Sequence, residues 1–356
     1  MTSQYRIDLF SDTNCHLSKG MRDYMMKADV GNEVAGEDPT VNLLLERTCD
    51  LLGKEAAVFM PSGTMCNGVS FRVLCKRAGD TIVLDKTAHA LHKASGLIPG
   101  LVHANPQLID GKRGIFTLEQ VKSVLETPDG YNVSKPRVIS IEQITNFGGG
   151  AIWPIQTLID ICDYAHKKEL NTHMDGARLF NAVIASGVSA AEYAKPFDAV
   201  WIDFCKGLGS PMGAVLAGSK AFIEEAWYYK FQQGGGLHKA GILAAACLYG
   251  LDNNLPRLQE VHQKTKELSK LLSQIDGIHL NPDDTECNII LLEIVHPRLQ
   301  ASIVEQKLKN FGIRTLAVSS TTLRIICHMD ITEKDIQEVY EKISYILETP
   351  DNVSEK

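Results

Sequence analysis

The sequence predicts an α/β protein with a mainly parallel sheet, followed by a small α+β C-terminal module. Short apolar and β-branched runs alternate with longer stretches in which apolar residues have helical spacing, as in strands joined by crossover helices. Polar residues recur where the predicted strands end, and in open α/β sheets ligands bind beyond those ends. The last hundred or so residues have a different, less regular pattern. We therefore expect one ligand site at the carboxyl edge of the sheet.

The first two-thirds of the chain supply the predicted sheet. Residues 1–22 are expected to form a separate arm, because helical periodicity breaks at 15–17 before a helix at 19–28. Pro39 lies near the start of the next helix, a position that suits proline. Strands are predicted at 56–60, 81–84, 137–141, 170–174 and 199–202, and helices at 64–75 and 155–166.

The remaining residues predict the smaller module. A helix rich in Lys, Glu and Gln is expected from about residue 255 to 275. Strands at 288–293 and 322–326 and helices at 299–311 and 333–347 follow it. We therefore divide the 356 residues into an arm (1–22), a large domain (23–250) and a small C-terminal domain (251–356).

Composition excludes several classes of protein. Hydrophobic residues make up 44% and charged residues 22%, which is ordinary for a soluble globular protein and unlike a disordered one. The net charge is −7 and no Lys/Arg-rich block is present, so no nucleic-acid partner is expected. The longest apolar stretches, such as 241–251, are about half of the ~20 residues that a membrane span needs, so no membrane partner is expected.

The nine cysteines are scattered singly and none forms a CxxC pair. A zinc ribbon or a dithiol redox site is therefore not indicated, and no metal site is expected. Scattered free thiols fit a reducing compartment, and the first residues lack the features of a signal peptide. These observations predict a cytoplasmic enzyme.

Asp175 and Lys206 are the strongest candidates for chemistry, because each directly follows a predicted strand. A lysine amine can form an imine with an aldehyde cofactor. A carboxylate at the next strand end can keep a pyridine nitrogen protonated, which makes pyridoxal phosphate an electron sink. The alternative is an ordinary surface lysine and a helix-capping aspartate.

Two further features could bind such a cofactor. Gly63 and Thr64 lie at a strand-to-helix junction, where free backbone N–H groups favour a phosphate, although a plain helix cap is the alternative. His89 follows another strand end and could stack on an aromatic ring or act as a general base. His92 competes for that role, and a structural or surface histidine remains the alternative.

Two arginines lie beside or within apolar segments. Arg178 follows Asp175 closely, and Arg324 interrupts the strand at 322–326. A guanidinium in such surroundings needs a carboxylate or phosphate partner. The alternative for Arg324 is an internal salt bridge, with Glu37 or Asp38 as partner. The glycines at 234–236 precede His238 and Lys239, which could offer cationic side chains to a phosphate.

Several motifs together resemble one family. The chain is similar to the low-specificity L-threonine aldolases, which are β-eliminating lyases among the fold-type-I pyridoxal phosphate enzymes. The motifs occur in the family's order and cover essentially the whole chain. They are Ser11–Thr13, Gly36–Thr40, Pro61–Met65, Asp175–Asn181, Lys206–Leu208 and Gly234–Gly236.

The resemblance implies an aminotransferase-like large domain with a seven-stranded sheet and a homodimer or homotetramer with shared active sites. It implies that Lys206 carries pyridoxal 5'-phosphate and that Asp175 holds the pyridine nitrogen. The remaining positions divide by role. Gly63, Thr64, Arg178 and His238 would contact the cofactor, His89 would stack on its ring, and Ser11, Arg178 and Arg324 would bind the substrate carboxylate.

The expected reaction is retro-aldol cleavage of a β-hydroxy-α-amino acid, L-threonine or L-allo-threonine, to glycine and an aldehyde, with His89 as the candidate base. β-Elimination or transamination remains an alternative, because Ala35 stands where the family usually has Tyr and segment 142–146 lacks its usual histidine. Cys205 also replaces a usual Ser before the lysine. A weakly catalytic ligand-binding scaffold is the third hypothesis. The preferred diastereomer stays open.

Overall fold

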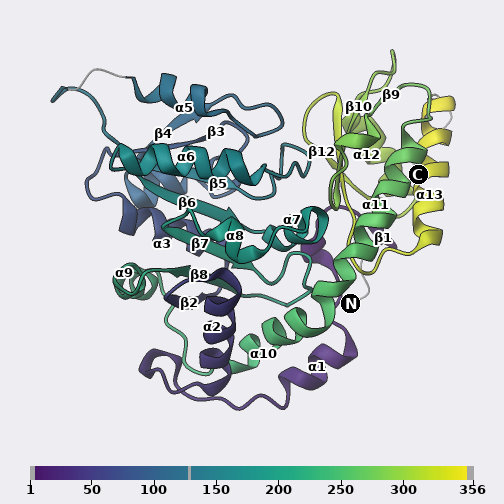
Figure 1. The fold of residues 1–356 in the computed structure, drawn as a ribbon. Helices are drawn as coiled ribbons and strands as arrows, with labels where there is room; N and C mark the ends of the chain where they lie inside the picture. The colour runs from purple at the N-terminus through teal and green to yellow at the C-terminus, as the bar shows by residue number, and fades with distance from the viewer. Residues whose placement is uncertain (1–4, 127–129, 351–356) are drawn as a thin grey trace. The chain divides into compact units, whose positions relative to one another are not determined.

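The computed structural model describes residues 5–126 and 130–350 (Figure 1). Its contacts divide the chain into a larger unit, residues 17–148 and 152–255, and a smaller unit, residues 1–16, 149–151 and 256–356. The sequence placed residues 1–22 in a separate arm and the domain boundary at 250/251. In the structure, residues up to His16 cluster with the C-terminal residues. The reason is a parallel pairing of β1 (Ile7–Asp8) with β11 (Ile313–Arg314).

The larger unit is built on a seven-stranded sheet with the order β2-β8-β7-β6-β5-β3-β4. β8 runs antiparallel to both of its neighbours, and the other adjacent strands pair in parallel. The predicted mainly parallel sheet is thus confirmed. Its strands are β2 (Ala56–Met60), β3 (Thr81–Asp85), β4 (Asn105–Ile109), β5 (Pro136–Glu142), β6 (Asn171–Gly176), β7 (Ala199–Asp203) and β8 (Ala214–Gly218).

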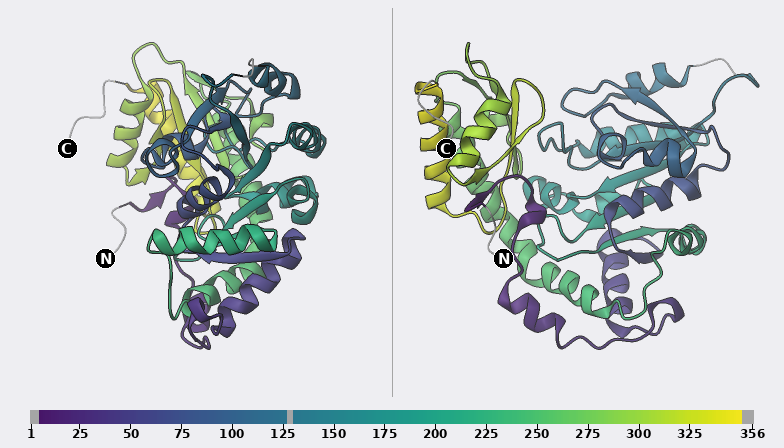
Figure 2. Two further views of the ribbon diagram at one scale, coloured as in Figure 1. Left: turned by 90° about the vertical axis from the view of Figure 1, so that its left-hand side faces the viewer. Right: turned by 180° about the vertical axis from the view of Figure 1, so that it is seen from behind.

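Helices flank this sheet on both faces (Figure 2). Every residue of β3, β7 and β8 is buried, which explains why these strands read as continuous apolar runs. The helices of the larger unit are α1 (Lys19–Met25), α2 (Pro39–Leu52), α3 (Gly63–Leu74), α4 (His89–His92), α5 (Leu118–Leu125), α6 (Ile155–Lys167), α7 (Leu179–Ser186), α8 (Ala190–Ala194), α9 (Lys220–Gln232) and α10 (Gly241–Tyr249).

Strand direction determines where the functional side chains gather. β2 and β7 both run antiparallel to β8, so β2 has the same direction as β7, β6, β5 and β3. The carboxyl ends of these five strands therefore lie at one edge of the sheet. Asp175 lies near the end of β6, and the segments that follow β2, β3 and β7 carry Gly63, His89 and Lys206.

The smaller unit has a four-stranded antiparallel sheet with the order β12-β13-β10-β9, as the predicted α+β module requires. Its helices bury apolar stripes in a separate core that includes residues of β1 and β10. The strands are β9 (Ile278–His279), β10 (Ile289–Ile294), β12 (Leu316–Ala317) and β13 (Thr322–Ile326), and the helices are α11 (Leu258–Leu272), α12 (Ala301–Asn310) and α13 (Glu333–Glu348).

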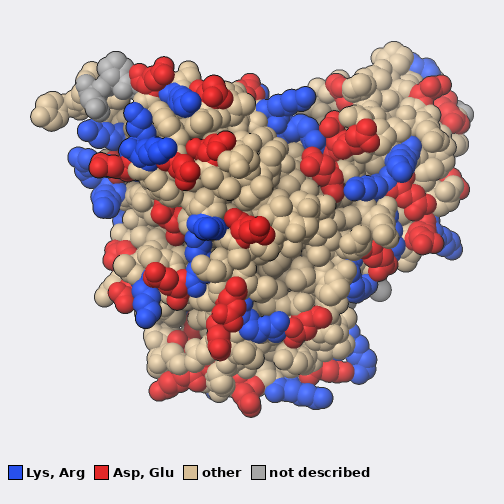
Figure 3. Space-filling view, viewed as in Figure 1, with Lys and Arg blue, Asp and Glu red and all other residues tan. Residues whose placement is uncertain are grey.

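Basic and acidic side chains are interspersed over the face drawn in Figure 3. This mixture agrees with a modest net charge of −7. Among the helices in the described ranges, none combines the length and apolar character needed to cross a membrane. The expectation that the chain has no nucleic-acid partner stays a prediction.

Candidate active site

Asp175 lies near the end of β6, in register with Glu142 on β5 and Trp201 on β7. Its carboxylate is buried and accepts hydrogen bonds from the Ala177 N–H at 3.1 Å and from Asn67 Nδ2 at 2.9 Å. Burial raises the pKa of Asp175, and the nearby Lys206 and these hydrogen bonds oppose the shift. The carboxylate of Asp175 is therefore held in place. Lys206 and the two hydrogen bonds do not fully offset the cost of burying its charge.

Asn67 belongs to the first turns of α3 and links Asp175 to Trp201. The indole Nε1 of Trp201 donates to Asn67 Oδ1 at 2.8 Å. Because an indole nitrogen can only donate, the amide oxygen of Asn67 must face Trp201 and its NH₂ must face Asp175. This relay orients the amide and, through it, the carboxylate.

Lys206 follows β7, and its ammonium lies against the same indole. Its Nζ is 3.0 Å from Asp203 Oδ2 and 5.6 Å from the centroid of the Trp201 ring. Burial lowers the pKa of Lys206, but the charges of Asp203 and Asp175, together with the hydrogen bond to Asp203, outweigh it, so that the pKa is raised overall. Asp203 is itself held by the Cys205 N–H at 2.9 Å. The amine is thus positioned as a cation by a carboxylate three residues before it.

Gly63 brings the start of α3 up to Trp201. A Cβ atom on Gly63 would lie 2.3 Å from carbons of the indole ring, so that only glycine fits without a shift. Thr64 follows and is exposed, and the first N–H groups of a helix have no partner within the helix. Gly63 of the predicted phosphate site and the predicted lysine, Lys206, therefore both lie beside Trp201.

A hollow at the same sheet edge is lined by His89, Glu142, Asp175, Ser140 and Trp153, among others. Burial, together with the charge of Asp175, raises the pKa of Glu142 to about 8. The hollow therefore holds a carboxyl group that can exchange a proton near neutral pH beside a histidine.

His92, the competing candidate, is exposed. Its Nε2 lies 2.5 Å from the backbone carbonyl oxygen of Lys86, to which it donates. His92 is therefore engaged with the backbone of its own loop. His89, not His92, lines the hollow.

Arg178 is buried at the start of α7. Its positive charge favours the ionised form of Glu142 and the neutral form of Lys206, so the guanidinium acts on both groups. A buried arginine in this position could bind a carboxylate or a phosphate ligand.

Comparison with known proteins identifies the family. A model of the beta-eliminating lyase family matches residues 8–294. The chain belongs to this family. It is 35% identical over 333 residues to low-specificity L-threonine aldolase 1 of Arabidopsis thaliana, covering 93% of each chain. It is 34% identical to the low specificity L-threonine aldolase of Escherichia coli O157:H7, covering 94% of this chain and 97% of that enzyme. The predicted family resemblance is thus confirmed.

A solved structure of threonine aldolase from Leishmania major shares the fold. It superposes with a TM-score of 0.81, at 18% sequence identity, over 96% of this chain and 99% of that one. This confirms the predicted aminotransferase-like α/β architecture of a beta-eliminating lyase.

The beta-eliminating lyase family implies pyridoxal phosphate, and the residues present fit that group. Lys206 offers an amine held by a single carboxylate, and Gly63, which has no side chain, lets the start of α3 pack directly against Trp201, the ring beside Lys206. Burial raises the pKa of Asp175 even against Lys206, so an added cation such as a protonated ring nitrogen would stabilise the carboxylate.

His238 lies in the loop between α9 and α10 and is exposed. Its Nδ1 is 3.4 Å from Asn32 Oδ1, and its carbonyl accepts the Glu33 N–H at 2.9 Å. These contacts hold it on the loop before α2. Its assignment to the cofactor phosphate stays a prediction.

The smaller unit brings Ser11 and Arg324 together. Arg324 is buried in β13, and its Nη2 donates to the carbonyl of Phe10 at 3.1 Å, directly before Ser11. Ser11 Oγ accepts from the N–H of Thr13 at 3.2 Å and from its hydroxyl at 2.9 Å. The role of both residues in binding a substrate carboxylate stays a prediction.

Asp38, a possible partner of Arg324 in the sequence analysis, caps a helix. Its Oδ1 accepts the N–H groups of Thr40 at 3.1 Å and Val41 at 3.0 Å. Its Oδ2 accepts those of Gly31 at 3.1 Å and Gly241 at 2.9 Å. Its lone pairs are therefore engaged in fixing the start of α2 and the adjoining loops.

Sequence reasoning missed Asn67, Trp201, Asp203 and Glu142. Asp203 and Glu142 end strands, so the rule that selected Asp175 and Lys206 would have found them as well. Asn67 lies four residues after Gly63 and so on the same face of α3. Only that spacing could have indicated its contact with the site.

Proposed function

We propose that this chain is a pyridoxal 5'-phosphate-dependent aldolase. It would cleave β-hydroxy-α-amino acids, such as L-threonine and L-allo-threonine, to glycine and an aldehyde. The observation that carries the proposal is one cluster around Trp201: Lys206 paired with Asp203, and Asp175 oriented by Asn67. The names of the relatives from Arabidopsis thaliana and Escherichia coli support the substrate class.

The cofactor supplies, when bound, a protonated pyridine ring that accepts the electron pair of the broken Cα–Cβ bond. Lys206 would hold it covalently, and Asp175 would keep its ring nitrogen protonated. Gly63 and Thr64 would offer backbone N–H groups and a hydroxyl to its phosphate, and His89 would stack on its ring. Asp203 orients the Lys206 amine for this attachment.

Cleavage also requires a base that removes the proton of the β-hydroxyl group. His89 remains the candidate from the sequence. Glu142 lines the same hollow, and its pKa of about 8 also suits proton exchange near neutral pH. Arg178 would bind the substrate carboxylate, a role that the resemblance also gives to Ser11 and Arg324.

The deciding experiment is an absorbance spectrum of the purified protein with and without L-allo-threonine, together with product analysis. We expect a yellow protein whose spectrum changes on adding substrate and which forms glycine and acetaldehyde. Pyruvate and ammonia from serine or cysteine, without aldehyde from threonine, would instead support a β-eliminating enzyme. Amino-group transfer to a keto acid would support an aminotransferase. A colourless protein that does not bind pyridoxal phosphate would support the scaffold hypothesis.

We also propose a cytoplasmic homodimer or homotetramer. Large apolar side chains are exposed on the larger unit, including Met26 at 82%, Tyr228 at 68% and Phe231 at 57%. Exposed apolar groups of this kind often mark protein interfaces. Light scattering after gel filtration would test the assembly, and a monomeric mass would contradict it.

A further inference from the structure

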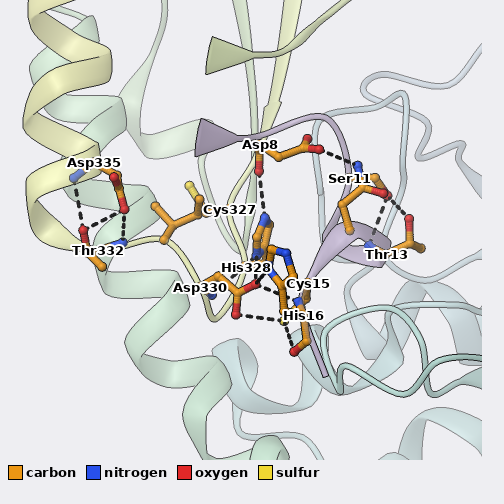
Figure 4. Close-up of polar contacts among 12 residues, drawn as sticks. Asp8, Ser11, Thr13, Cys15, His16, Cys327, His328, Asp330, Thr332 and Asp335 are labelled. Carbon is orange, nitrogen blue, oxygen red and sulfur yellow. Dashed lines mark hydrogen bonds and ion pairs between the residues drawn. The ribbon is translucent and has the colours of Figure 1, made fainter. Parts of the chain in front are cut away.

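A cluster of metal-ligand side chains lies in the smaller unit, just beyond β13 (Figure 4). Cys15, His328 and Asp330 each offer one ligand atom, and these atoms lie within 4.8 Å of one another. The proposed aldolase chemistry uses none of these residues. The sequence analysis expected no metal site, because no CxxC pair is present. Cys15 and Asp330 are 315 positions apart, so no short motif joins them.

The contacts of His328 show which of its nitrogens could bind a metal ion. The side chain is buried, and Nε2 lies 2.7 Å from the backbone carbonyl oxygen of Asp8. A carbonyl oxygen only accepts, so Nε2 carries the hydrogen and Nδ1 has the lone pair. That lone pair accepts a long hydrogen bond from the Asp330 backbone N–H at 3.4 Å, which a metal ion would have to replace. Nδ1 lies 4.0 Å from Asp330 Oδ2, on the side of the cluster. Metal-binding histidines are commonly fixed by such a hydrogen bond from the second nitrogen to a carbonyl.

Asp330 is oriented by the neighbouring His16. Its Oδ2 accepts the backbone N–H of His16 at 2.7 Å and lies 2.8 Å from the ring nitrogen Nδ1 of the same residue. Its Oδ1 lies 3.4 Å from Cys15 Sγ. Each oxygen thus has a defined direction, with Oδ1 turned toward the thiol.

The Cys15 thiol donates its hydrogen to Asp330 Oδ1, with Sγ 3.4 Å from that oxygen. A divalent cation can take the place of this hydrogen and bind both groups. Solvent can reach the cluster, since the Asp330 side chain is 34% exposed and that of His16 is 73% exposed.

We propose that Cys15, His328 and Asp330 bind Zn²⁺, with a water molecule as the fourth ligand and His16 as the group that orients Asp330. A thiolate, an imidazole and a carboxylate suit zinc, whereas Ca²⁺ and Mg²⁺ prefer oxygen ligands alone. Bonds of about 2.0–2.3 Å in a tetrahedron place ligand atoms roughly 3.3–3.8 Å apart. The Sγ–Oδ1 distance of 3.4 Å already fits. His328 Nδ1, which lies 4.0 Å from the other carboxylate oxygen, Oδ2, would have to move toward the ion.

The ion would join two segments of the smaller unit. Cys15 ends the short segment that carries Ser11, and His328 and Asp330 follow the strand that carries Arg324. Zinc binding would therefore hold the Ser11 segment against the end of β13. This is a structural role, and it does not require the ion to touch a substrate.

Cobalt and zinc titrations of the intact protein, carrying its cofactor and stripped of metal with a chelator, test the proposal. We expect one Co²⁺ per chain, with a thiolate-to-cobalt charge-transfer band in the difference spectrum, and loss of that band when Zn²⁺ is added. Cys15→Ser and Asp330→Asn should abolish the band or weaken Zn²⁺ binding by at least about 100-fold, and His16→Ala should weaken it by roughly 10-fold.

Cys49→Ser is the matched control, because Cys49 is another half-buried free cysteine and lies in the larger unit. It should keep the band and the affinity for zinc. Circular dichroism checks that each variant is folded. The proposal is overturned if the unmodified protein shows no band, or if the Cys15→Ser variant binds Zn²⁺ as tightly as the unmodified protein. Because the readout is metal binding, either result leaves the aldolase proposal unaffected.

Discussion

Two lysines of the larger unit each pair with a carboxylate beside a tryptophan ring, but their pKa values shift in opposite directions. Lys206 pairs with Asp203 near Trp201, and Lys230 of α9 pairs with Glu33 over the ring of Trp227, with Nζ 4.0 Å from the ring centroid. Burial lowers the pKa of Lys230 in spite of Glu33. At Lys206, burial is outweighed by Asp203 and Asp175 together, and the pKa is raised.

Access separates the two lysines further. The Lys206 side chain is 17% exposed and lies at a strand end beside a second carboxylate, Asp175. The Lys230 side chain is 0% exposed, and its partner Glu33 is 2% exposed. A lysine with no path to solvent cannot react with a ligand, so the pair at Lys230 is structural. A lysine–carboxylate pair therefore indicates chemistry only where a ligand can reach it.

The largest expected effect comes from removing the accessible lysine. Lys206→Ala should lower aldolase turnover by at least roughly 10⁴-fold, because the group that attaches the cofactor is lost. The yellow absorbance of the protein should disappear as well. Turnover with L-allo-threonine and the visible spectrum are the measurements, and a fully active Lys206→Ala variant would refute the assignment.

Replacing Lys230, whose side chain has no access to solvent, should instead affect stability. Lys230→Met leaves Glu33 buried without its cation and should lower the free energy of unfolding by about 3–5 kcal/mol. The double variant Glu33→Gln/Lys230→Met should recover most of that loss. Urea unfolding measures both effects, and turnover of the folded Lys230→Met protein should stay within a few-fold of normal. A loss of turnover as large as that of Lys206→Ala would erase the distinction between the two lysines.

The strand-end rule explains what the sequence could predict. β2 and β13 were predicted with the observed bounds, and α6 to within one residue, because each has a clear apolar period and a clear stop. The same rule placed Asp175 and Lys206 at one edge, and both lie in the Trp201 cluster.

Other elements have no local sequence pattern from which they could be predicted. β4 reads Asn-Pro-Gln-Leu-Ile and is an edge strand, where proline is tolerated but hides the strand pattern. β8 is five small or aliphatic residues that could equally begin a helix. The partners Lys230 and Glu33 are 197 residues apart, and only the folded chain brings them together. Contacts of this kind depend on tertiary packing, which the spacing along the sequence does not encode.

Asp175, the second carboxylate near Lys206, tests whether the surroundings of this lysine are built for chemistry. Asp175→Asn keeps the shape of the side chain but removes the charge proposed to hold the ring nitrogen protonated. We expect kcat to fall roughly 100-fold, as for the loss of one preorganised electrostatic group, while the visible absorbance is retained because Lys206 is intact. Steady-state kinetics and a spectrum check this. Unchanged kcat would show that Asp175 is not the partner of the ring nitrogen.

The smallest effect is the dependence of stability on alkaline pH in cofactor-free protein. The raised pKa of Lys206 means that the folded state binds its proton more tightly than the unfolded state. Its contribution is present below the ordinary lysine pKa and is lost as pH rises through the raised value. The lowered pKa of Lys230 has the opposite sign: its penalty is present below the lowered value and is relieved as pH rises toward the ordinary value.

Unfolding free energies should therefore be compared between about pH 8 and pH 11, a window that brackets the ordinary lysine pKa. The difference between the unmodified protein and Lys206→Met should shrink as pH rises, because the stabilising proton is lost. The difference between the unmodified protein and Lys230→Met should grow in favour of the unmodified protein. Each comparison cancels the titration of tyrosines and cysteines that all three proteins share. If both stability differences changed with pH in the same direction, the pKa values of the two lysines would be shifted in the same direction. Solvent access alone would then have to explain why only Lys206 is reactive.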